Sequence, residues 1–199
     1  MRQIINGRTI PDIPDRIEVD RVDRKGSRSG SAGILLLTLV LLLSRTPADA
    51  AGNQRQLDFY HTHTKESLAI VYHDGNDYIA AALEQINHFL SDFRTGLVHA
   101  IDPATLDILF TLRTELGGED TFEIISAYRS PETNAMLRKQ GRGVARRSQH
   151  LEGKAIDVRL RSVDTTRLRD AAIKLQLGGV GYYRESNFVH VDSGRVRTW

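Results

Sequence analysis

The pattern of apolar and polar positions predicts a mixture of strands and amphipathic helices between about residue 57 and the C-terminus. Apolar residues recur at three- and four-residue steps from Tyr78 to Phe93, which is typical of a helix that packs on a core. Short runs rich in β-branched and aromatic residues indicate strands. These runs cover residues 57–63, 68–73, 121–126, 156–160 and 187–191. The first two runs are separated by a short polar segment, so they predict a hairpin.

Capping signals place three more helices. Asp102-Pro103 is expected to begin one, because proline is tolerated at the first helical position, and Gly117-Gly118 is expected to end it. Ser130-Pro131 begins another, and a short apolar periodicity over residues 168–177 predicts the last. No internal repeat is visible in this order of elements.

Residues 1–50 are predicted to be an export signal with a long basic front. Basic residues precede an apolar run from Gly33 to Leu43, which is shorter than the ~20 residues of a membrane span but within the ~7–15 of a signal-peptide core. Ala48-Asp-Ala50 fits a small-x-small cleavage site. An uncleaved anchor, a buried core helix and a downstream start codon remain alternatives. With cleavage, the mature domain covers residues 51–199, has no stable membrane span and is periplasmic or associated with the cell envelope.

Composition narrows the chemistry further. At 199 residues and 40% hydrophobic, the chain can bury one ordinary core. The net charge is +2 and the basic residues are spread along the chain without a nucleic-acid motif, so no nucleic-acid partner is expected. Cysteine is absent, which leaves only nitrogen and oxygen ligands for any metal ion.

Three residues form the candidate metal site. His150, Asp157 and His190 offer two imidazoles and one carboxylate, the ligand set of a catalytic zinc site that keeps its fourth position for water. Gly153 is small enough to allow a tight turn after His150, and the alternating strand that follows carries Asp157. A ligand in a loop and another on the strand after it can face the same ion.

Other polar residues are weaker candidates. Arg129 is expected between a strand end and a helix start, where its guanidinium either hydrogen-bonds a substrate carbonyl or braces a loop. His61 and His63 share one face of the first strand, where an exposed edge-strand pair is favoured over a metal site. His99 lies in a loop, a location where functional residues are common.

Several motifs together resemble an exported bacterial family of murein endopeptidases with the zinc fold of D-alanyl-D-alanine carboxypeptidases and hedgehog proteins. The resemblance covers residues 57–199. Its motifs are Phe59-Tyr-His-Thr-His63, Ile125-Ser-Ala-Tyr-Arg-Ser-Pro-Glu-Thr-Asn134, Ser148-x-His-x-x-Gly-Lys-Ala-Ile-Asp157, and Gly179-Val-Gly-Tyr-Tyr183 with Phe188-Val-His-Val-Asp192.

The resemblance implies a single α+β domain with a central antiparallel sheet flanked by helices and a zinc site in an open groove. It implies that His150, Asp157 and His190 bind Zn²⁺, that Arg129 orients substrate or stabilises the tetrahedral intermediate, and that the substrate is the peptide crosslink of peptidoglycan. Two other functions remain open. One is a non-catalytic peptidoglycan-binding module that keeps zinc as a structural clip, and the other is a zinc carboxypeptidase that trims stem peptides.

One departure from the wider fold leaves the general base unassigned. Many relatives place an acidic residue or a histidine two or three residues before the second metal histidine, where this chain has Phe188 and Asn187. Asp192 lies on the same strand face as His190, so it is a candidate either for proton transfer or for holding the imidazole. Glu185 and the histidines at 61, 63 and 99 are further candidates.

Overall fold

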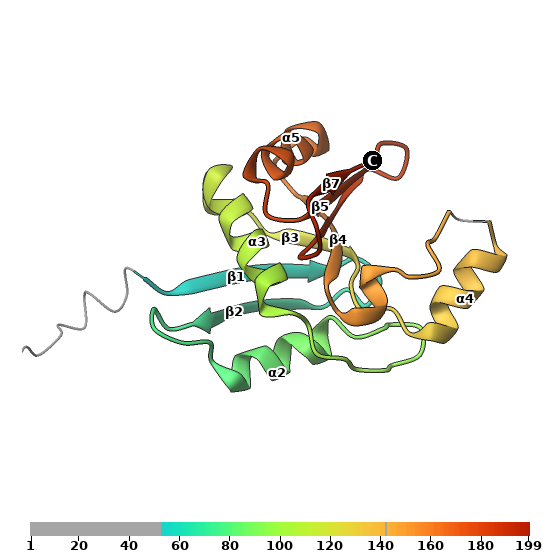
Figure 1. Ribbon diagram of the computed structural model, residues 1–199. Helices are drawn as coiled ribbons and strands as arrows, with labels where there is room; N and C mark the ends of the chain where they lie inside the picture. The colour runs from blue at the N-terminus through green and yellow to red at the C-terminus, as the bar shows by residue number, and fades with distance from the viewer. Residues whose placement is uncertain (1–52, 142) are drawn as a thin grey trace, which may run out of the picture. The chain divides into compact units, whose positions relative to one another are not determined.

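The computed structural model describes residues 53–141 and 143–199, which form one mixed sheet with helices packed against it (Figure 1). The strands are β1 (Arg55–His61), β2 (Ser67–His73), β3 (Phe122–Ser126), β4 (Ala155–Leu160), β5 (Gly179–Tyr183), β6 (Phe188–Asp192) and β7 (Arg197–Thr198). The helices are α2 (Ala80–Phe89), α3 (Pro103–Glu115), α4 (Pro131–Lys139), α5 (Thr165–Leu175) and the short 3₁₀ helix η1 (Gln149–Glu152). The predicted export signal lies outside the described residues. Within them, no helix is both long and apolar enough to cross a membrane.

The α+β class is confirmed, but the prediction of an antiparallel sheet is wrong in part. The strand order is β2-β1-β3-β4-β6-β5-β7, and both β1 with β3 and β5 with β7 pair in parallel. Between β1 and β3 the chain forms the β2 hairpin strand and two helices, which is long enough to bring β3 back alongside β1 in the same direction. The other neighbouring strands are antiparallel.

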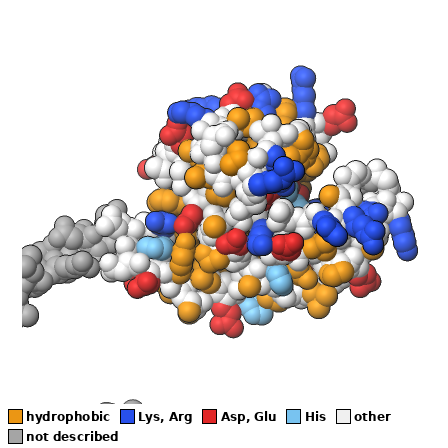
Figure 2. All heavy atoms as spheres, viewed as in Figure 1, with side chains coloured by type: hydrophobic (Ala, Val, Ile, Leu, Met, Phe, Trp, Pro, Cys, Tyr) orange, Lys and Arg blue, Asp and Glu red, His pale blue; other side chains and the backbone are white. Residues whose placement is uncertain are grey.

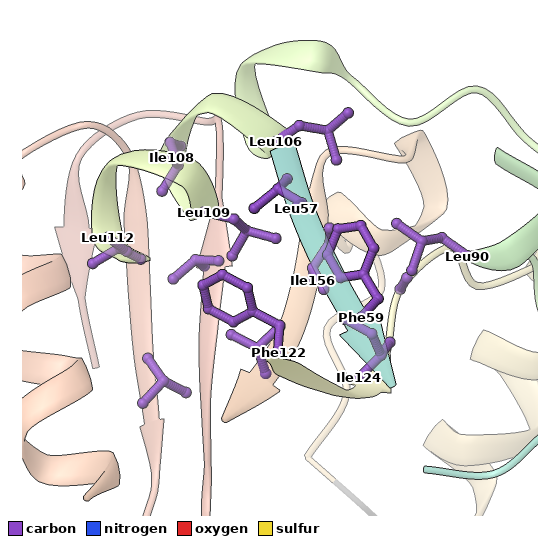
Figure 3. Close-up of a cluster of buried hydrophobic side chains, with 14 of the residues drawn as sticks. Leu57, Phe59, Leu90, Leu106, Ile108, Leu109, Leu112, Phe122, Ile124 and Ile156 are labelled. Atoms are coloured by element: carbon purple, nitrogen blue, oxygen red, sulfur yellow. The ribbon is translucent and has the colours of Figure 1, made fainter. Parts of the chain in front are cut away.

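The hydrophobic core lies between one face of the sheet and helices α2, α3 and α5. In Figure 3, Leu57 and Phe59 of β1 lie beside Ile156 of β4, with leucines of α3 above them. Side chains alternate across a strand, so the burial of Ile156 and Val158 on this face places Asp157 on the opposite face. The candidate site therefore lies on the face of the sheet away from the main core.

The helix starts predicted at Asp102-Pro103 and Ser130-Pro131 are confirmed, whereas the helices predicted over residues 78–93 and 168–177 run from Ala80 to Phe89 and from Thr165 to Leu175. The Asp102 carboxylate accepts a hydrogen bond from the Ala104 N–H at 3.0 Å, and the Ser130 hydroxyl accepts one from the Thr133 N–H at 3.1 Å. Proline follows each cap, where its missing N–H costs no helical hydrogen bond. The cap at Ser130 fixes the backbone next to the candidate site residue Arg129.

Candidate metal centre

Four neighbouring strands bring the site together. In the sheet register, Ser126 of β3 is opposite Asp157 of β4, which is opposite His190 of β6, which is opposite Gly181 of β5. Directly paired residues point to the same face of a sheet, so these positions form a row across it. A register shift in β3 just before Ser126 interrupts the regular pairing next to Asp157, as bulges often do beside functional sites.

The third candidate ligand, His150, reaches this row from η1. The Ser148 hydroxyl accepts the His150 N–H at 3.4 Å at the start of η1, and Gly153 ends it in the left-handed conformation at φ 66°. A side chain at Gly153 would collide with the carbonyl oxygen of Ala100. The tight turn predicted for Gly153 is therefore present, and glycine is required there on both counts.

The donor atoms converge as a metal site needs. His150 Nε2 lies 3.2 Å from Asp157 Oδ1 and 3.2 Å from His190 Nδ1, while His190 Nδ1 lies 2.8 Å from Asp157 Oδ1. Two donors each about 2.1 Å from a tetrahedral zinc ion are roughly 3.4 Å apart, so this triangle is close to the size required. Within the described chain, these three residues are the group of His, Asp and Glu side chains that could hold a metal ion.

Each imidazole has one nitrogen that faces away from Asp157, and the hydrogen-bond partner of that nitrogen shows that it carries a hydrogen. His150 Nδ1 lies 2.7 Å from the Ala127 carbonyl oxygen, and His190 Nε2 lies 2.9 Å from Asp192 Oδ2. Both partners are acceptors, so these two nitrogens donate, and in a neutral imidazole the lone pair is then on His150 Nε2 or His190 Nδ1, the nitrogens that face Asp157. Binding of a metal ion would replace the second proton of His190. Two lone pairs and a carboxylate aimed at one point are electrostatically complementary to a cation.

The pKa shifts agree with a site that holds positive charge. Burial lowers the pKa of His150, and its neighbours His190 and Arg129 lower it too, which keeps this imidazole neutral against the opposing effect of Asp157. Burial also acts to lower the pKa of His190, but the hydrogen bonds to Asp157 and Asp192 outweigh burial and raise the pKa to about 9. Burial acts to raise the pKa of Asp157, but the two histidines outweigh it and lower the pKa well below its ordinary value.

Asp192 lies behind His190, on the side away from the other two ligands. Its side chain is fully buried and accepts hydrogen bonds from His190 Nε2 and from both terminal nitrogens of Arg197, at 3.0 and 2.7 Å. The backbone N–H of Gly194 adds another at 2.8 Å. The carboxylate is thus surrounded by donors that hold it against the imidazole.

Arg129 lies on the other side of the centre, at the junction that the sequence predicted. Its terminal nitrogen is 3.8 Å from Asp157 Oδ2, and its backbone N–H donates to the His150 carbonyl oxygen at 3.1 Å. Asp92 fixes this segment by accepting the Ser130 N–H at 2.9 Å. Burial lowers the pKa of Arg129, while Asp157 and Tyr183 act to raise it. Its terminal nitrogens donate at 3.5 Å to the Asn134 amide oxygen and the Ser126 hydroxyl, and each of them carries a second N–H. The buried Nε has no hydrogen-bond partner among the described residues.

The other histidines that were candidates for the site differ in burial and in whether they line the cavity. His61 is buried, and burial together with nearby His63 lowers its pKa to about 4, so the prediction of an exposed edge-strand pair is wrong for this residue. The reason is that β1 pairs with β2 on one side and with β3 on the other, so it is an interior strand of the sheet. His63 stacks on Phe93 with ring centroids 4.0 Å apart and lines the cavity at the centre. His99 and Glu185 are exposed and do not line it.

A cavity of about 810 Å³ contains the inward-facing ligands and Arg129. Its lining includes four arginines, and among the described lining residues Asp157 is the single carboxylate. Figure 2 shows basic side chains gathered over the right-hand part of the molecule, where α4 and the segment after it lie. The charge of the cavity favours an anionic ligand. The same composition leaves no second carboxylate in the lining to act as a general base.

Sequence reasoning missed three contributors near the C-terminus. Arg197 pairs with Asp192, Trp199 packs its indole 5.1 Å from the His190 ring, and Tyr183 accepts a hydrogen bond from that indole. Arg197 and Trp199 are two residues apart at the end of the chain, and no signal in the sequence pairs them with β5. The strand itself spans only Arg197–Thr198, too short for a periodicity to reveal.

An α+β fold with a His/Asp group that could hold one metal ion beside a cavity is a combination that metal-dependent hydrolases use. Residues 49–199 match the model of the family described as peptidoglycan L,D-endopeptidase MepK, and the chain belongs to this family. The protein of that name from Escherichia coli K12 is 41% identical over 145 residues, which cover 73% of this chain and 80% of the relative. A probable MepK from Haemophilus influenzae is 38% identical over 185 residues, 91% of this chain and 97% of the relative. The family resemblance seen in the motifs is therefore confirmed.

Proposed function

We infer that this chain is a peptidoglycan endopeptidase, and we propose that it hydrolyses the peptide crosslinks of the bacterial cell wall with one bound zinc ion. The family membership supports the reaction class. The relatives' names specify an L,D-endopeptidase, so the bond that we propose is one between an L- and a D-configured centre. Such an enzyme has to act outside the cytoplasmic membrane, which agrees with the export signal expected in residues 1–50.

The observation that carries the zinc proposal is the convergence of His150 Nε2, Asp157 Oδ1 and His190 Nδ1, which lie 2.8–3.2 Å from one another at a cavity. Structural zinc sites are closed by four protein ligands, whereas catalytic sites use three and leave one position for water or substrate. Three ligands that line a cavity therefore favour an enzyme over a wall-binding module that keeps zinc as a clip. A zinc ion bound there would lower the pKa of a water ligand to about 7 and polarise the scissile carbonyl.

The protein groups around the ligands have separate tasks. Asp192 keeps the Nε2 proton of His190 in place, which leaves Nδ1 as the ligand atom and fixes the ring orientation. Because its carboxylate is buried and already accepts from Arg197 and Gly194, we assign Asp192 to positioning and not to proton transfer. Arg129 lines the cavity on the opposite side, and the second N–H of a terminal nitrogen can donate to the oxygen that gains negative charge as the carbonyl is attacked. The arginines of the cavity attract the carboxylates of the crosslinked peptides.

Replacing Asp192 with asparagine is expected to lower zinc affinity by about 10- to 100-fold, because the amide keeps the shape but loses the charge that holds His190. Competition with a chromophoric chelator measures this affinity. Asp58→Asn is a matched control, since Asp58 also pairs with an arginine, Arg113 at 2.6 Å, but away from the metal centre. Equal zinc affinity in Asp192→Asn and Asp58→Asn would contradict the positioning role.

The reaction is tested by incubating the purified full-length protein and zinc with muropeptide dimers of known crosslink, followed by mass spectrometry. We expect dimers with an L,D crosslink to become monomers. Release of a single terminal amino acid would instead identify a carboxypeptidase. Binding of the dimers without cleavage by zinc-loaded protein would support the wall-binding module.

A further inference from the structure

The wall of the cavity next to His190 is formed by Trp199 and Tyr183. The Trp199 backbone N–H donates to the Val180 carbonyl oxygen at 3.2 Å, and the Tyr182 N–H donates to the Trp199 carbonyl oxygen at 3.1 Å. These two bonds hold the indole over Gly181, where a Cβ would lie 2.6 Å from the ring. Gly181 thus provides the space in which the indole packs against the His190 ring.

Tyr183 is fixed by contacts on two sides. Its ring stacks on Phe188, its partner in the β5–β6 register, with centroids 4.5 Å apart and 16° between the planes. Its hydroxyl oxygen accepts the Trp199 indole N–H at 3.1 Å. A phenol can donate one hydrogen bond as well as accept, and no acceptor for the Tyr183 O–H is found in the described part of the chain. Tyr183 therefore presents an oriented, unused donor at the cavity that it lines.

The same register places this donor beside the metal centre. Gly181 is opposite His190, and Tyr183 follows two residues later on the same strand face, about 7 Å along β5 at ~3.3 Å per residue. Tyr183 and Arg129 both line the cavity at this centre. The phenol and the guanidinium therefore face one cavity, where the phenol O–H and the second N–H of an Arg129 terminal nitrogen can donate to the same ligand.

We propose that the Tyr183 O–H is a second hydrogen-bond donor to the scissile carbonyl oxygen, acting together with Arg129, and that the Trp199 indole N–H sets its direction. This inference rests on the proposed peptidase function. Tyr183 forms no covalent bond, so its contribution is a hydrogen bond that strengthens as charge develops on the oxygen.

Tyr183→Phe tests the proposal, because it removes one hydroxyl and keeps the ring that stacks on Phe188. We expect kcat on L,D-crosslinked dimers to fall by about 10²-fold with KM changed by less than about 3-fold, as for loss of one donor to a developing oxyanion. Tyr182→Phe is the matched control. The Tyr182 ring points to the other face of β5, where Arg169 lies 4.7 Å from it, so its kcat should be unchanged.

Fluorescence separates catalysis from folding and binding, because Trp199 is the single tryptophan of the sequence. Tyr183→Phe should shift the Trp199 emission, since the indole N–H loses its acceptor. Titration of chelator-treated protein with dimers should then give the same dissociation constant for wild type and Tyr183→Phe. Trp199→Phe should lower kcat less than Tyr183→Phe does. This variant keeps the Tyr183 hydroxyl and removes only the indole N–H that orients it.

The outcomes distinguish this inference from the function on which it rests. If the wild type cleaves no crosslink, the proposed function fails. If the wild type cleaves but Tyr183→Phe keeps its kcat, with KM either unchanged or raised, the role of Tyr183 as a second donor is refuted. The proposed peptidase function still stands in that case. An unchanged Trp199 emission in Tyr183→Phe would refute the orienting role of the indole.

Discussion

Replacing His150 with alanine is expected to abolish both zinc binding and crosslink cleavage. The variant loses one of three donor atoms that lie 2.8–3.2 Å from one another, and two protein ligands do not retain zinc against dilution. We expect less than about 0.1 zinc per chain and a rate at least ~10³-fold lower, because the ion supplies both the activated water and the polarised carbonyl. Metal analysis and the muropeptide assay measure the two effects on the same sample.

The fold should survive this substitution. Asp157 and His190 still form their 2.8 Å pair, which remains bound to Asp192 and Arg197. Circular dichroism checks this point. His99→Ala is the matched control, since His99 is exposed, stacks on Tyr128 and lies outside the cavity lining. Asp157→Ala should lose zinc and activity in the same way, and full activity in either ligand variant would contradict the assignment.

Replacing Arg129 with lysine is expected to lower kcat by about 10²- to 10³-fold, with zinc content unchanged. Lysine keeps the charge but has a single donor group on a flexible stem, so it cannot replace the fixed guanidinium fork. Loss of one donor to a developing oxyanion costs about 3–4 kcal/mol in other hydrolases. Steady-state kinetics on L,D-crosslinked dimers measure kcat and KM separately.

Arg159→Lys is the matched control for this prediction. Arg159 also lies on the non-core face of β4, two residues from Asp157, but its partner is Glu123 at 2.6 Å and it does not line the cavity. We expect normal kcat for this variant. If Arg129→Lys raises KM and leaves kcat unchanged, Arg129 binds the substrate equally in its ground state and transition state. That result would contradict selective stabilisation of the transition state by Arg129.

Local features of the sequence predicted the helices well, and residue type alone allowed the candidate ligands to be proposed. Asp102-Pro103 and Ser130-Pro131 predict helix starts because a cap depends on atoms within three residues. The turn at Gly153 is also local, since it needs a positive φ and no side chain. His150, Asp157 and His190 could be proposed together because their residue types fit one metal ion, and the structure brings them together.

Features that depend on distant pairing could not be predicted. The parallel pairing of β1 with β3 joins segments separated by two helices, and it is this pairing that buries His61. Asp192 was recognised as a neighbour of His190, but only the contacts of Arg197 and Gly194 favour positioning over proton transfer. The pair of Trp199 and Tyr183 depends on a two-residue strand whose partner is β5, so no pattern within that strand could indicate it.

The measurement that tests the central claim most directly is a zinc titration of metal-free full-length protein, with cleavage of an L,D-crosslinked muropeptide dimer as the readout. The account predicts no cleavage before zinc is added, a linear rise in rate, and a break at one zinc per chain. Full cleavage by the metal-free protein, or zinc binding at one equivalent with no cleavage at all, would contradict the claim that these three ligands hold a catalytic ion.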